Sequence, residues 1–116
     1  MPKKFIKSLN YAKIGAQHAL LTQRNIWIHL SIGVLVIAAA VWLKISLAQT
    51  AILVLTITFV VVLEMLNTAL EEIVNLLKPE KHPLAALAKN IAAAAVLTAA
   101  VGAAIVGLLI FIPKIL

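Results

Sequence analysis

Three long runs of apolar residues follow one another along the chain, and each has the length of a membrane-crossing helix. They cover residues 26–43, 51–77 and 84–112. The first spans 18 residues without a charge, which is the lower limit for a helix that crosses a bilayer. The third ends in 22 uncharged residues, roughly 33 Å of helix at about 1.5 Å per residue, before Pro113 and Lys114, where we expect it to stop. We therefore predict an all-α membrane protein with three transmembrane helices.

The first 24 residues have a different pattern, in which apolar positions recur at helical spacing among lysines and amides. This pattern is typical of an amphipathic helix that lies on a membrane surface. We do not expect a signal peptide, because the first long apolar run begins only at Ile26 and no small-residue cleavage pattern follows it. The apolar positions that define the face are Phe5, Leu9, Ala12, Ala16, Ala19 and Leu20.

Two short polar segments connect the apolar runs. Residues 44–50 form the first connection and residues 78–83 form the second. Pro79 and Pro83 predict a turn in the second, because proline cannot continue a helix but suits the first turn of the next one.

Composition restricts the class of protein further. Hydrophobic residues make up 64% of the 116 residues, against roughly 45–50% in an ordinary soluble domain. Because so small a globule cannot bury that much apolar side chain, a soluble enzyme is excluded, and so is a disordered chain. The chain contains no cysteine, which excludes a disulfide scaffold and a thiolate metal site. We interpret residues 1–116 as a single membrane domain.

The basic residues flank the apolar runs instead of forming one patch. The net charge of +6 therefore indicates an anionic membrane surface and no nucleic-acid partner. Eight of the ten basic residues lie before the first run or around the second connection, and only Lys44 and Lys114 lie on the other side. Because basic residues favour the cytoplasmic side, we predict a cytoplasmic N-terminus, a cytoplasmic turn at residues 78–83 and an outward C-terminus.

All four carboxylates lie between residues 64 and 80, and two of them share a helix face with two amides. Glu64, Asn67, Glu71 and Asn75 fall within roughly 60° of one another at about 3.6 residues per turn. An ionisable side chain at the depth of Glu64 costs at least a few kcal/mol if it faces lipid, so it must face protein, water or a ligand. This polar stripe either serves ions, protons or substrate, or holds helices together through hydrogen bonds. Glu72 lies off the stripe and is expected to be a solvated interfacial charge.

Three further polar side chains have either a functional or a purely structural role. Lys89 follows the turn at about the depth of Glu71, where its ammonium either neutralises phosphate oxygens or extends to the interface. His82 lies in the turn, while His29 lies within the first run, where we expect it to bond a neighbouring helix. No GxxxxGK[ST] or GxGxxG motif is present, so any nucleotide site must be built from side chains and a metal ion.

Three stretches resemble one known family. EMLNTALEEIV at residues 64–74, HPLAALAKN at 82–90 and QRN at 23–25 are similar to the small bacterial membrane kinases that act on diacylglycerol or undecaprenol. The resemblance extends over essentially the whole chain, and the closing FIPKIL is similar to the undecaprenol kinases of Gram-positive bacteria. It implies a homotrimer in the bacterial inner membrane with three shared sites near the cytoplasmic interface. It also implies transfer of the ATP γ-phosphoryl group to the hydroxyl of undecaprenol or diacylglycerol, with Mg²⁺.

The resemblance also implies roles for individual residues. Glu64 corresponds to the general base that acts on the lipid hydroxyl, and Asn67 to a residue that orients the site. Glu71 and Gln23 correspond to Mg²⁺-binding positions. Lys89 corresponds to the residue that contacts the transferred phosphates. The nucleotide-binding positions are Glu80, His82, Lys89 and Asn90.

Three positions depart from the family's pattern, and each replaces an acid by an amide. Gln23 stands where the family usually has Glu, while Asn75 and Asn90 stand where it has Asp. An amide oxygen can bind Mg²⁺ but brings no negative charge, and hard cations favour carboxylates. A catalytically impaired or engineered scaffold with the kinase fold is therefore the alternative interpretation. A small proton-coupled exporter is disfavoured, because such chains usually have four spans and a carboxylate in the first.

Overall fold

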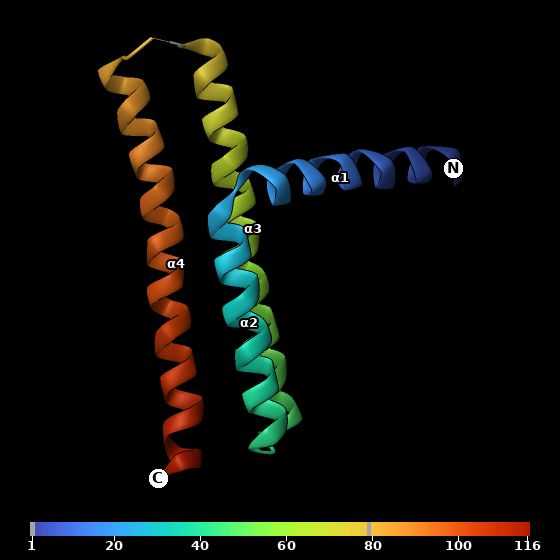
Figure 1. The fold of residues 1–116 in the computed structure, drawn as a ribbon, viewed down its shortest axis with the longest axis vertical. Helices are drawn as coiled ribbons and strands as arrows, with labels where there is room; N and C mark the ends of the chain where they lie inside the picture. The colour runs from blue at the N-terminus through green and yellow to red at the C-terminus, as the bar shows by residue number, and fades with distance from the viewer. Residues whose placement is uncertain (1, 79) are drawn as a thin grey trace.

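The computed structural model describes residues 2–78 and 80–116 and contains four helices in this part of the chain (Figure 1). They are α1 (Pro2–Thr22), α2 (Arg24–Trp42), α3 (Leu47–Leu77) and α4 (Pro83–Ile115). The last three are long and apolar enough to cross a membrane, which confirms the all-α class and the three predicted spans. Met1, expected in the surface helix, and Pro79, expected in the turn, lie outside the described residues.

The helix α3 is the centre of the bundle, because both α2 and α4 pack against it. The helix α1 leaves the bundle sideways from the start of α2 (Figure 1). The three bundle helices differ in length: α2 has 19 residues, α3 has 31 and α4 has 33. At about 1.5 Å per residue, the α3–α4 hairpin therefore extends roughly 18 Å beyond the first turn of α2.

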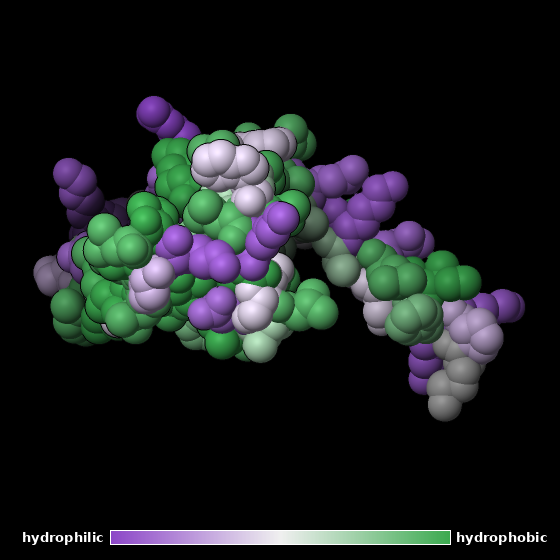
Figure 2. Space-filling model, turned by 90° about the horizontal axis from the view of Figure 1, so that it is seen from below, coloured by the Kyte–Doolittle hydropathy of each residue, from purple (hydrophilic) through white to green (hydrophobic). Residues whose placement is uncertain are grey.

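Most of the apolar surface of the bundle is not buried within the protomer. Figure 2 shows apolar side chains over the flanks of the bundle and hydrophilic ones on its near end and along α1. Only 11–17% of the residues in the most apolar stretch of each long helix are buried. A membrane, further copies of the chain, or both must cover these flanks.

The helices α2 and α3 pack tightly at Gly33 of α2. A β-carbon placed there would lie 2.8 Å from Cγ2 of Ile57 on α3, so only glycine fits without a shift of the neighbour. Gly102 and Gly107 of α4 have open space instead, with no atom within 4 Å of an added β-carbon. The glycines of α4 therefore make no close helix contact within the protomer.

The connection between α2 and α3 is shorter than predicted, because α3 begins at Leu47 and not at residue 51. The Ser46 side chain caps α3 by accepting a hydrogen bond from the Gln49 backbone N–H at 3.1 Å. Before it, Lys44 has φ 55°, and Ile45 N–H donates to the Ala40 carbonyl at 3.0 Å. This left-handed residue closes α2, and such a position normally favours glycine.

The end of α4 differs from our expectation at Pro113. We expected Pro113 and Lys114 to stop the helix, but α4 continues through Pro113 to Ile115. Proline removes only one backbone donor so close to a helix end. The last turn is still closed, because Leu116 N–H donates to the Ile112 carbonyl at 3.0 Å.

The orientation of α1 is tied to α2 by Trp27. Its indole N–H donates to the Leu20 carbonyl at 2.6 Å, near the end of α1. This bond supplies a partner for one of the carbonyls that a helix end leaves unpaired. Gln23 lies between the two helices with an extended backbone. The helix predicted over residues 1–24 is thus present as α1, while its position on a membrane surface stays a prediction.

Candidate functional site

The predicted polar stripe runs along α3 from the interior of the bundle to its exposed end. Glu64 is buried, Asn67 and Glu71 are half-buried, and Asn75 is exposed. The expectation that Glu64 does not face lipid agrees with this burial, since its side chain is only 4% exposed. The stripe therefore leads from a buried position inside the bundle to an exposed one near the hairpin end.

Glu64 faces His29 of α2. The distance from His29 Nε2 to Glu64 Oε1 is 3.2 Å, and the His29 side chain is 23% exposed. The expectation that His29 bonds a neighbouring helix agrees with this contact. Its partner could not be derived from sequence, because nothing in the pattern specifies how α2 is rotated relative to α3.

Asn67 and Glu71 are directly connected, one helical turn apart. The Asn67 amide donates to Glu71 Oε1 at 3.0 Å. This leaves Asn67 Oδ1 buried and without a hydrogen-bond partner among the described residues. A buried acceptor without a partner costs roughly 1–3 kcal/mol, so the oxygen is suited to a cation or to a donor from a ligand.

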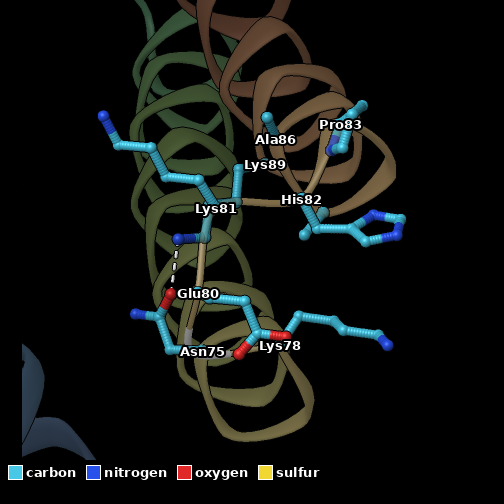
Figure 3. A pocket seen from close by; sticks show the side chains of 9 residues that line it. Asn75, Lys78, Glu80, Lys81, His82, Pro83, Ala86 and Lys89 are labelled. Atoms are coloured by element: carbon cyan, nitrogen blue, oxygen red, sulfur yellow. Dashed lines mark hydrogen bonds between the residues drawn. The ribbon is translucent and has the colours of Figure 1, made fainter.

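A second part of the site lies where α3 and α4 meet at the hairpin end. The Lys89 ammonium of α4 donates to Asn75 Oδ1 of α3, as the dashed line in Figure 3 shows. Both residues line a cavity of about 490 Å³ together with Glu80 and His82. Two further lysines, Lys78 and Lys81, also line it. The cavity is large enough for part of a nucleotide and contains three cationic side chains.

The Lys89 ammonium reaches Asn75, about one turn nearer the hairpin than the level of Glu71 at which we expected it. Helical side chains tilt toward the N-terminus of their helix, and for Lys89 this direction leads to Pro83 and the hairpin. Asn75 is therefore within its reach. His82 also has a structural task that we did not anticipate: its Nδ1 accepts from Leu84 N–H at 3.1 Å and caps α4.

The structure does not bring every predicted residue together. Asn90 does not line the hairpin cavity formed by the described residues. Gln23 lies at the α1–α2 junction and makes no capping hydrogen bond with its side chain. Glu72 is exposed as expected, and it also pairs with His18 of α1 at 3.3 Å, a contact that the sequence analysis missed. His18 and Glu72 lie on α1 and α3, which α2 separates along the chain, and helical spacing within one run cannot reveal such a pair.

The donor chemistry of the stripe fits Mg²⁺. Asn67 Oδ1 and the Glu71 carboxylate are hard oxygen donors on one face of α3. The described residues contain no group of three His, Cys, Asp or Glu side chains that could hold a metal ion. Mg²⁺ tolerates such a sparse site, since it is usually held by one or two carboxylates together with waters and substrate phosphates.

Comparison with known proteins places the chain in a family. The model of the prokaryotic diacylglycerol kinase family matches residues 10–111. Since this match covers most of the chain, the protein belongs to the prokaryotic diacylglycerol kinase family. The expected family is thus confirmed.

Relatives in this family carry two different names. The chain is 46% identical over 110 residues to a diacylglycerol kinase of Synechocystis sp., covering 94% of this chain and 63% of that relative. It is 38% identical over 112 residues to the undecaprenol kinase of Bacillus subtilis, covering 97% of this chain and 91% of that relative. It is 28% identical over 102 residues to the diacylglycerol kinase of Escherichia coli K12, covering 88% of this chain and 84% of that relative. The chain thus spans less than two thirds of the Synechocystis protein, and these identities do not single out the undecaprenol kinases.

Proposed function

We propose that this chain transfers the γ-phosphoryl group of ATP to the hydroxyl of a membrane lipid, undecaprenol or diacylglycerol. The observation that carries the proposal is the continuous path from buried Glu64 through Asn67 and Glu71 to the Lys89–Asn75 pair. Membership of a family with named lipid kinases supports the same reaction class. Phosphoryl transfer needs positioning and charge neutralisation above all, and both are available along this path.

For the individual residues we propose the roles that the resemblance to the family implies. Glu64, the deepest carboxylate, serves as general base for the lipid hydroxyl, and Asn67 orients the groups around it. Glu71, with Gln23, holds Mg²⁺, which neutralises charge on the phosphates when bound. Lys89 contacts the transferred phosphates. The nucleotide lies at the hairpin end beside Glu80 and His82, and Asn90 contacts it from α4 although it does not line the cavity there.

We further propose that the working form is a homotrimer in the bacterial inner membrane, with the N-terminus in the cytoplasm. The exposed apolar flanks and the open faces at Gly102 and Gly107 support association with further copies. The distribution of basic residues supports the orientation. A native mass other than three chains in detergent, or cytoplasmic labelling of a tag after Leu116, would contradict these two points.

Transfer of labelled phosphate from ATP to undecaprenol and to diacylglycerol, in detergent and with or without Mg²⁺, tests the function. We expect transfer to one of the lipids, dependent on Mg²⁺ and abolished by Glu64→Gln, because an amide cannot accept the hydroxyl proton. Glu72→Gln is the matched control, since Glu72 is exposed and paired with His18. If the wild-type chain transfers phosphate to neither lipid, the result favours a catalytically impaired scaffold with the kinase fold. The amides Gln23, Asn75 and Asn90, at positions where the family usually has acids, are the reason for this alternative.

A further inference from the structure

The helix α1 contacts two different helices of the bundle. It packs against α2, which follows it in the chain, and against α3, which does not. At α2, the Trp27 indole N–H donates to the Leu20 carbonyl at 2.6 Å. Contacts with α2 alone would let α1 rotate about Gln23, the one extended residue that joins the two helices. The contact with α3 therefore sets the direction in which α1 leaves the bundle (Figure 1).

One side-chain hydrogen bond connects α1 to α3 within the described residues. It joins His18 Nε2 to Glu72 Oε1 over 3.3 Å. The ring nitrogen can donate to the carboxylate whether the imidazole is neutral or charged, so the contact requires no particular charge on His18. The two side chains are 54% and 64% exposed, so the bond adds little to the stability of the fold. Its main effect is on the orientation of α1.

The position of Gln23 follows that of the last turn of α1. Gln23 N–H donates to the Ala19 carbonyl at 2.9 Å, which attaches the residue to that turn. Within the same turn, the Thr22 hydroxyl donates to the His18 carbonyl at 2.7 Å. A movement of His18 relative to α3 therefore moves Gln23 as well.

On α3, the partner of His18 lies next to a residue of the polar stripe. Glu72 directly follows Glu71, whose carboxylate accepts the hydrogen bond from Asn67. Neighbouring residues on a helix point about 100° apart, so Glu72 can hold α1 while Glu71 stays on the stripe. The His18–Glu72 bond thus links the segment that carries Gln23 to the helical turn that carries Glu71.

We propose that His18 and Glu72 are positioning residues of the lipid kinase reaction. Their bond holds α1 on α3 and so fixes where Gln23 lies relative to Glu71. This inference rests on the proposed function, in which Gln23 and Glu71 hold Mg²⁺ and Glu64 is the general base. Without the bond, only a fraction of the molecules has α1 in the competent position, and the apparent affinity for the ion falls by that fraction.

Alanine variants separate this role from a general loss of structure. We expect His18→Ala and Glu72→Ala each to raise the Mg²⁺ concentration for half-maximal rate by about two- to fivefold, as suits an exposed pair. The kcat at saturating Mg²⁺ and the KM for the lipid should not change. Exchanging the pair, His18→Glu together with Glu72→His, should restore the wild-type Mg²⁺ dependence. Gln17→Ala, which removes an exposed neighbour on α1, and Glu72→Gln, which keeps an acceptor oxygen, are the matched controls.

A distance measurement tests the same bond without turnover. The chain contains no cysteine, so Lys7→Cys on α1 and Leu47→Cys at the start of α3 introduce the only two thiols for spin labels. In labelled chains diluted with unlabelled wild-type chains, we expect one narrow distribution of distances between the labels. His18→Ala and Glu72→Ala should broaden this distribution, and Gln17→Ala should not.

Two results would overturn the positioning role. If the distance distribution stays narrow in His18→Ala, the bond does not hold α1. If the distribution broadens while the Mg²⁺ dependence stays that of the wild type, the bond holds α1 but does not position the metal site. A wild-type chain without transfer to any lipid would overturn the proposed function and the positioning role together, whereas the distance distributions would still decide whether the bond holds α1.

Discussion

The Lys89 ammonium donates a hydrogen bond to the side-chain carbonyl of Asn75 across the α3–α4 hairpin. The bond holds a cation at the wall of the hairpin cavity. Asn75 is one of the three positions where the resemblance to the family leads us to expect an acid and this chain has an amide. The position therefore still accepts a hydrogen bond from Lys89, but it leaves the positive charge of the ammonium uncompensated and available to phosphate.

Loss of the Asn75 acceptor should weaken nucleotide binding. We expect Asn75→Ala to raise the KM for MgATP by about two- to tenfold, because an exposed hydrogen bond contributes roughly 0.5–1.5 kcal/mol and Lys89 loses its fixed position. The value of kcat should change little. Asn10→Ala, which removes an exposed amide on α1, is the control and should leave the KM unchanged. An unchanged KM in Asn75→Ala, measured by initial rates over a range of ATP, would show that the bond does not position Lys89.

A carboxylate at residue 23 should strengthen the Mg²⁺ dependence of the reaction. We expect Gln23→Glu to raise activity by about ten- to a hundredfold and to lower the Mg²⁺ concentration for half-maximal rate, because it restores a charged ligand. Asn75→Asp and Asn90→Asp should help less. Gln17→Glu on the exposed part of α1 is the control and should have no effect. If rate and Mg²⁺ dependence do not change in Gln23→Glu, the metal does not lie between residues 23 and 71.

The contact between α2 and α3 should not tolerate a side chain at Gly33. An added β-carbon would lie 2.8 Å from Cγ2 of Ile57, and a β-branched side chain in a helix has little freedom to move away. We expect Gly33→Ala to destabilise the protein by about 1–3 kcal/mol. Gly15→Ala on α1, where an added β-carbon meets nothing within 4 Å, should be neutral or stabilise by up to about 1 kcal/mol. Thermal unfolding in detergent measures both, and equal midpoints would contradict the close approach.

The left-handed residue after α2 offers a stabilising substitution. Lys44 has φ 55°, which costs a residue with a β-carbon roughly 1–2 kcal/mol. We expect Lys44→Gly to raise the free energy of unfolding by about 1 kcal/mol. Lys44→Ala keeps the β-carbon and should give no gain, so it separates backbone relief from loss of the lysine charge. A midpoint that rises equally in both variants would assign the effect to charge.

The helices could be predicted from the sequence because each apolar run is long and uninterrupted, and α3 carries its polar residues at helical spacing. Contacts between helices could not be predicted in the same way. The Lys89–Asn75 bond depends on where α4 begins and on the tilt of its side chains, and the His29–Glu64 contact depends on the rotation of α2 about its axis. Ser46 and His82 cap their helices with side chains whose capping role the apolar pattern did not reveal.

The unequal lengths of α2 and α3 give the two halves of the proposed reaction different surroundings. The α3–α4 hairpin extends beyond α2 (Figure 1), so with α2 spanning the hydrocarbon layer we expect the additional twelve residues of α3 and the matching start of α4 to stand in water. The charged triphosphate of the nucleotide then stays hydrated outside the hydrocarbon layer. The apolar chain of the lipid alcohol stays inside that layer. In the proposed reaction only the phosphoryl group passes from the aqueous side to the lipid. The length by which the α3–α4 hairpin exceeds α2 determines the distance of this transfer from the hydrocarbon layer.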